Sequence, residues 1–192
     1  EKKGEIGDAE INHQKEISWD KRDIETILNR CKSKYEKDVI VYCLAKVSRI
    51  NTKSPWYYNS CLDCTQKPLK RATDFWCFKC SKAIEKQLIR YRIELCVEDK
   101  TETTIFTILD SEAKKLIGQD AMTLYDDHLS KIDEDDEDTS PIPELIQSSF
   151  IGKEFLFKLK ITNYNHDPRN RQTFTLIKIM DKSTNLDKSI ID

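Results

Sequence analysis

The chain has 192 residues, of which 38% are hydrophobic and 34% are charged, and its formal net charge is −2. This length can bury one substantial core. No apolar run approaches the length of a membrane span and the first residues carry no signal-peptide pattern, so we expect no membrane partner. The chain begins at Glu1 rather than Met, which indicates a fragment of a longer protein.

The charge is unevenly distributed. Residues 126–138 hold eight acidic residues and one lysine, a local charge of −7, which leaves +5 on the remainder of the chain. The overall acidity therefore does not argue against a nucleic-acid partner. We expect residues 126–140 to form a solvated acidic loop.

The first part of the chain predicts a tail, a helix and a strand. Residues 1–17 are charged and lack periodicity, which is typical of a tail or linker, so the domain itself is expected over 18–192. Asp20 is a candidate N-cap for a helix whose apolar residues recur at helical spacing. Residues 39–50 are β-branched and apolar, which indicates a buried strand.

Four further strands and two helices are predicted. Residues 87–97 alternate between apolar and charged side chains, and residues 103–109 form the next strand. A helix is expected over 110–118, ending at Gly118, and a short one begins near Pro141. Residues 154–164 and 171–181 then form a hairpin.

This order of elements predicts a mainly β protein. Five strands with a helix between the third and the fourth is the order of an OB-fold, a small Greek-key barrel. A cysteine-rich module at 54–82 is inserted between strands 1 and 2, and helices flank the barrel.

The inserted module carries two Cys-x-x-Cys pairs separated by twelve residues: Cys61, Cys64, Cys77 and Cys80. Four thiolates in two tight turns fit a closed, structural Zn²⁺ site. The alternatives are disulfides or buried free thiols. The other three cysteines are scattered in apolar segments, which favours a reducing compartment and a role as small core residues.

We find no residues that predict catalysis. Four thiolates leave a zinc ion no open position, and the three histidines lie far from the cysteines in sequence. A deaminase would need a His-x-Glu motif before its Cys-x-x-Cys pair, and only four glycines are present, none in a phosphate-binding loop. The sequence therefore predicts that the protein is not an enzyme.

Single-stranded nucleic acid is a better-supported ligand. Binding it needs cations for the phosphates and flat rings for the bases. The cations and rings that we single out are Lys158, Lys160, Tyr164, Arg171, Arg90, Arg92, Phe75 and Phe78. An ordinary solvated strand face is the alternative for the strand residues, since surface strands often carry lysine. For Phe75 and Phe78 the alternative is packing within the cysteine module, which is too small to have a larger core.

Several motifs together identify a family. They are Trp56-Tyr57-Tyr58-x-x-Cys61-x-x-Cys64, Cys77-x-x-Cys80, Tyr91-Arg92, Leu116-Ile117-Gly118-Gln119 and Phe155-x-Phe157-Lys158-x-Lys160-x-x-x-Tyr164-Asn165. From about residue 19 to 181 the chain resembles the C-terminal DNA-binding domain of the replication protein A large subunit. The family also includes telomeric paralogues in telomerase assemblies, and these motifs do not separate the two.

The resemblance implies an OB-fold with an inserted zinc ribbon that binds single-stranded DNA in the nucleus. It implies that Lys158, Lys160 and Tyr164 contact DNA and that the domain docks smaller OB-fold subunits through a helix after the barrel. Two departures support a second hypothesis, an assembly module with weak DNA binding. Ile105 and Leu109 stand where aromatic residues are common in the family, and residues 185–192 are short for an assembly helix. A zinc-ribbon protein acting on RNA or transcription is a third reading.

Overall fold

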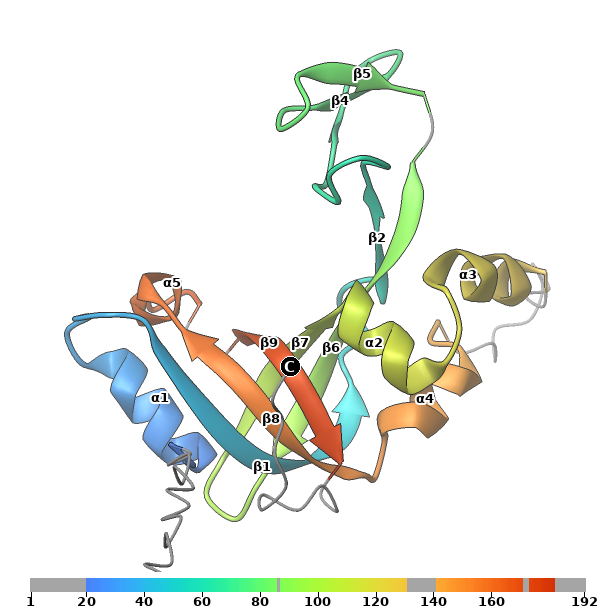
Figure 1. The fold of residues 1–192 in the computed structure, drawn as a ribbon. Helices are drawn as coiled ribbons and strands as arrows, with labels where there is room; N and C mark the ends of the chain where they lie inside the picture. The colour runs from blue at the N-terminus through green and yellow to red at the C-terminus, as the bar shows by residue number, and fades with distance from the viewer. Residues whose placement is uncertain (1–19, 86, 131–140, 171–172, 182–192) are drawn as a thin grey trace, which may run out of the picture.

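The computed structural model describes residues 20–85, 87–130, 141–170 and 173–181. It is mainly β with flanking helices, as predicted, and Figure 1 shows a barrel-like body from which a slender arm projects. The expected tail at 1–17 and the end of the chain, 182–192, lie outside the described residues. None of the described helices is long and apolar enough to cross a membrane.

Five long strands form the body: β1 (Val39–Ile50), β6 (Leu88–Glu98), β7 (Thr103–Leu109), β8 (Glu154–Ile161) and β9 (Thr173–Asp181). They lie in the order β1-β8-β9-β7-β6, and β1 also pairs with β6, so the pairings close into a ring. The β7–β9 pairing is parallel and the others are antiparallel. The sheet is therefore mixed.

The interior is filled by the alternating apolar residues of these strands. On β8, Phe155, Phe157, Leu159 and Ile161 are all buried, as the alternation predicts. Phe157 lies edge-to-face against Phe106 of β7, with 5.1 Å between ring centroids. Strands with one apolar face must close on one another to hide it, which accounts for a single core.

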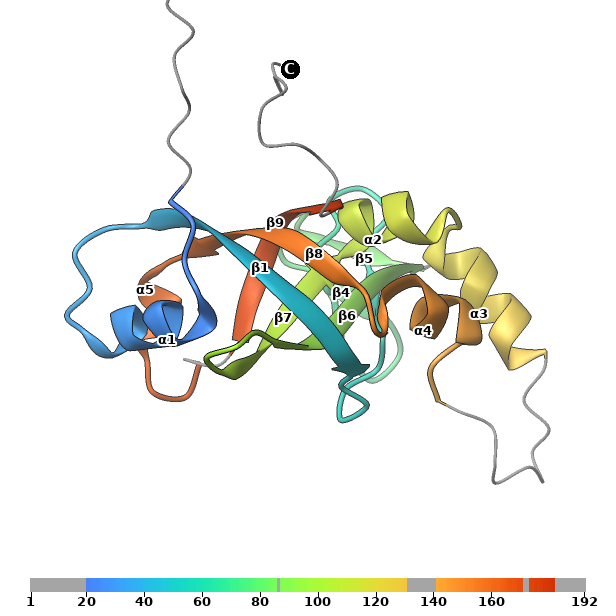
Figure 2. The ribbon, with the colours of Figure 1, turned by 90° about the horizontal axis from the view of Figure 1, so that it is seen from below.

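Helices cover both ends of the barrel. Figure 2 shows α1 (Ile24–Lys32) at one end and α2 (Asp110–Ile117), α3 (Ala121–Leu129) and α4 (Glu144–Phe150) at the other. The predicted stop at Gly118 is confirmed, because this residue adopts the left-handed conformation with φ of 78°.

Two predicted boundaries are wrong. Asp23, not Asp20, caps α1, because the Asp20 carbonyl accepts a hydrogen bond from the Tyr42 backbone and the chain there is still extended. Strand β8 ends at Ile161 rather than residue 164, because Thr162 and Asn165 form a capping box that starts the short helix α5 (Asn163–His166).

Helix α3 was not predicted, and it makes the first four residues of the expected acidic loop helical. Its acidic residues, Asp126 and Asp127, lie toward its C-terminus, where they oppose the helix dipole. It folds because Ala121 and Leu124 are buried on the barrel, a tertiary contact that local propensity does not reveal.

The projecting arm is the segment between β1 and β6. Strand β2 (Tyr57–Ser60) pairs with the start of β6 to form its stem. Beyond the stem, β3 (Leu69–Lys70), β4 (Phe75–Cys77) and β5 (Lys82–Ile84) form a separate three-stranded sheet. We call residues 54–85 the arm.

Candidate metal centre and nucleic-acid interface

The four predicted cysteines meet at one point in the arm. Their sulfur atoms all lie within 4.8 Å of one another, with 3.9 Å between Cys61 and Cys80 and 3.3 Å between Cys64 and Cys77. Four sulfurs at about 2.3 Å from a zinc ion in a tetrahedron would be about 3.8 Å apart. The arrangement fits a four-thiolate metal site.

The two cysteine turns share a backbone conformation and differ in the acidity of their thiols. Thr65 and Ser81 each follow the second cysteine of a pair, and both adopt positive φ, 63° and 53°. A backbone hydrogen bond from Cys80 lowers the pKa of Cys77 to about 7, although burial opposes the shift. The hydrogen bond with Cys64 contributes most to raising the pKa of Cys80 to about 12, so the pKa values of the cluster diverge.

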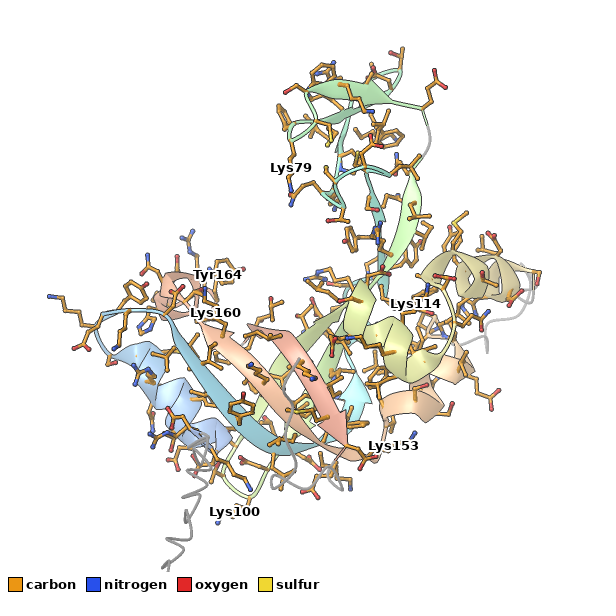
Figure 3. All side chains as sticks on the ribbon, viewed as in Figure 1. Lys79, Lys100, Lys114, Lys153, Lys160 and Tyr164 are labelled. Atoms are coloured by element: carbon orange, nitrogen blue, oxygen red, sulfur yellow. The ribbon has the colours of Figure 1, made fainter. Side chains whose placement is uncertain are left out.

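The arm has little core besides this cluster. Cys61, Cys77 and Ile84 form its separate buried cluster, with Phe75 half-buried against them. Phe78 by contrast is 70% exposed, and Lys79 beside it points away from the arm in Figure 3. Of the two arm rings predicted to meet DNA, Phe75 contributes to packing and Phe78 is free to stack.

Arg90 lies at the root of the arm and joins three elements. Its guanidinium contacts Asp110 of α2 at 2.8 Å and donates to the Ser60 hydroxyl of β2 at 2.9 Å. The other Asp110 oxygen accepts from the Tyr91 backbone at 3.1 Å, so Asp110 serves this junction instead of capping α2. Arg90 is half-buried here, which favours a structural role over a phosphate contact.

Arg92 lies two residues further along β6 than Arg90, beside a hollow. Its guanidinium contacts Glu94 at 2.7 Å, and the buried Glu94 also accepts from the Asn51 amide at 2.6 Å. The hollow, of about 790 Å³, lies between the arm and the barrel and is lined by Tyr57, Tyr58, Asn59, Gln66, Lys67, Arg92 and Leu109, among others. It combines rings, amides and cations, the groups that contact nucleotides.

The remaining predicted residues lie across the barrel from the arm. Lys160 and Tyr164 are adjacent in Figure 3, and Tyr164 is 62% exposed. It stands on α5 rather than on the strand where the alternation placed it. The ammonium of Lys158 lies 5.7 Å from the centre of the Tyr42 ring. Arg171 lies outside the described residues.

Sequence reasoning missed the acidic partners of these cations. Asp38 contacts Lys160 at 2.8 Å and accepts from the Tyr35 hydroxyl at 2.9 Å. Arg169 likewise pairs with Asp167. Asp167 lies two residues from its partner in sequence, whereas Asp38 lies 122 residues from Lys160 and could be found only with a structure.

The chain resembles known proteins over most of its length. Residues 40–189 match the model of the Replication factor-A C terminal domain family. A 70 kDa DNA-binding subunit of replication protein A from Arabidopsis thaliana is 29% identical over 143 residues, which are 73% of this chain and 22% of that protein. Replication factor A protein 1 of Saccharomyces cerevisiae is 30% identical over 58% of this chain and 17% of its own.

Solved structures show the same fold. A replication protein A heterotrimer bound to single-stranded DNA matches with a TM-score of 0.60 at 20% identity, over 85% of this chain and 36% of that one. Yeast RPA bound to single-stranded DNA matches with a TM-score of 0.51 at 20% identity, over 80% and 82%.

The fold and the site thus define a class of domain with a closed β body and a four-cysteine arm. This chain belongs to the replication factor-A C-terminal domain family. The resemblance found in the motifs is thereby confirmed. The chain spans about a fifth of the length of the curated relatives that it matches first.

Proposed function

We propose that this domain binds single-stranded DNA without catalysing a reaction. The strand runs between the arm and α5, with phosphates near Lys158 and Lys160 and bases against Tyr164 and Phe78. The observation that carries the proposal is the exposure of a ring and a cation on each of two elements, Phe78 and Lys79 on the arm and Tyr164 and Lys160 at α5 and the end of β8. The hollow lies at the root of the arm, beside Arg92 and Leu109.

The proposed architecture is a five-stranded OB-fold barrel with a zinc ribbon inserted between its first two strands. The closed ring of pairings with its parallel β7–β9 contact supports this, since the OB-fold is a small Greek-key barrel. The domain would correspond to residues 18–192, with the ribbon at 54–82.

Cys61, Cys64, Cys77 and Cys80 would hold one structural Zn²⁺. Their all-sulfur composition and close spacing support zinc over a hard cation such as magnesium. The ion would link the two cysteine turns and so fix the shape of the arm.

In the cell, we propose a nuclear role beside smaller OB-fold subunits of a replication protein A-like complex. The family membership and the heterotrimeric solved relatives support this role. A telomeric or telomerase-associated paralogue is the more specialised form of the same proposal.

The test is a fluorescence anisotropy titration with mixed-sequence and telomeric-repeat oligonucleotides at two salt concentrations. Replacing Lys158 and Lys160 together by alanine should weaken binding, because two phosphate contacts are lost, and should flatten the salt dependence. Lys100→Ala, at the far end of the barrel in Figure 3, is the control. Unchanged affinity and slope in the double variant would refute the groove.

A second function, docking of smaller OB-fold subunits with weak DNA binding, rests on one observation. Leu109 is 40% exposed and Ile105 is half-buried on a face that solvent can reach. Gel filtration with candidate subunits, run beside the DNA titration, separates the two functions. Tight binding of a short oligonucleotide by the domain alone would count against this second function.

A further inference from the structure

Three of the cations expected to face DNA already have an acidic partner within the domain, and so does the neighbouring Arg169. The pairs are Lys160–Asp38, Arg90–Asp110, Arg92–Glu94 and Arg169–Asp167. A phosphate that approaches such a cation must compete with a carboxylate that is already in place. The proposed DNA-binding surface is therefore rich in cations, but the charges of these four are balanced by neighbouring carboxylates.

These pairs are not equivalent. Arg90 and Arg92 are tied into the root of the arm through half-buried or buried carboxylates, so their pairs are part of the fold. Asp167 lies two residues from Arg169, on the same turn. Asp38 comes from a separate segment, the approach to β1, and meets Lys160 across the β1–β8 pairing, and unlike Asp110 it is exposed.

Asp38 is held in its competing position. The Tyr35 hydroxyl donates to its second oxygen, and Tyr35 in turn packs edge-to-face on His166 of α5, with 5.3 Å between ring centroids. The Lys160 and Tyr35 hydrogen bonds keep the pKa of Asp38 below its ordinary value, so it is ionised at neutral pH. Both side chains of the pair remain solvent-accessible, so a phosphate can reach Lys160.

We propose that Asp38 is a specificity-determining residue that competes with DNA phosphate for Lys160. By reducing the phosphate contribution, it makes binding depend on rings and apolar side chains that contact bases. This inference rests on the proposed function and predicts something further: a shallow salt dependence in the natural protein. Each phosphate contact on a single strand adds about 0.7 to the slope of log affinity against log salt.

The experiment compares Asp38→Asn with the natural protein by anisotropy titration at four salt concentrations. The asparagine still accepts from Tyr35 but no longer pairs with Lys160 as an ion. We expect affinity at low salt to rise about twofold to fivefold, the range of an exposed ion pair. We expect the slope to steepen by about 0.7.

Asp120→Asn is the matched control, because Asp120 pairs with Lys114 at the opposite end of the barrel with similar exposure. It should change neither quantity. Combining Asp38→Asn with Lys160→Ala should abolish the gain, which separates competition for Lys160 from a general charge effect.

The outcomes distinguish this inference from the proposed function. Binding by the natural protein with no gain in Asp38→Asn would overturn the inference and leave DNA binding intact. The same gain in Asp120→Asn would also overturn it. Absence of binding by both the natural protein and Asp38→Asn would refute the proposed function itself, whereas binding by the variant alone would support both.

Discussion

Thr65 and Ser81 occupy equivalent places in the two cysteine turns and share a backbone conformation that side chains resist. A β-branched residue such as threonine at φ of 63° is a true outlier, and the left-handed region costs non-glycine residues about 1–2 kcal/mol. Neither residue is glycine, although glycine would relieve the crowding. The arm therefore stores strain at the places that hold its sulfurs.

Thr65→Gly should relieve this strain and raise zinc affinity. We expect about fivefold tighter retention of zinc, which corresponds to about 1 kcal/mol, in a competition with a chromogenic chelator. Gln66→Gly, at the next position, is the control and should not tighten retention. An equal or weaker affinity in Thr65→Gly would mean that the threonine side chain compensates for its conformation.

At the same scale, single residues mark the limit of sequence-based prediction. Alternation on β8 correctly placed Phe157 inside and Lys160 outside, because strand geometry is local. It could not reveal that Lys160 pairs with Asp38, because that contact depends on the register between β1 and β8. The alternation of residues 87–97 likewise placed the charged Glu94 on the exposed face. In the structure Glu94 is buried, and it accepts a hydrogen bond from the Asn51 amide.

The arm is the element whose stability is most separable from the rest. Its sheet joins the barrel through the β2–β6 stem, and its buried cluster is distinct from the main core. A unit this small has too few apolar contacts to fold alone and depends on a metal or equivalent cross-link.

Cys61→Ser should therefore unfold the arm while the barrel survives. Zinc content measured by atomic absorption should fall from one ion per chain, the strand signal in circular dichroism should largely persist, and DNA affinity should fall because the groove loses one wall. Cys43→Ala, in the barrel core, is the control that should keep zinc while lowering stability. Global unfolding of Cys61→Ser would mean that the arm supports the barrel as well.

Elements were predictable where a pattern is local and long. The bounds of β1 and β7 match the expected 39–50 and 103–109 because continuous β-branched runs end at polar turns. Helix α3 was not predicted because its acidic C-terminal end resembles a loop. Helix α5 was not predicted because it starts at a capping box, in which two side chains bond to nearby backbone groups. The cluster of four cysteines was predictable because the spacing of two Cys-x-x-Cys pairs is itself typical of a shared metal site.

At the scale of the whole molecule, the barrel closes through contacts that are distant in sequence. The last pair of the β1–β6 ladder is Ile50 with Leu95, and the entire arm lies between these two residues. The stem of the arm pairs Tyr57 with Tyr91. Tyr57 follows Ile50, and Tyr91 precedes Leu95, by only a few residues. An arm that folds first thus carries the two barrel strands toward one another.

A metal bound in the arm would therefore take part in folding kinetics. The entropy of closing a loop grows with the logarithm of its length, so a preformed arm should lower the barrier to β1–β6 pairing by roughly 1 kcal/mol. Stopped-flow refolding should then be about fivefold faster with zinc than with a chelator. A rate difference confined to unfolding would show instead that the arm forms after the barrel. In a cell, the supply of zinc would set how long the unpaired edges of this barrel stay open to aggregation.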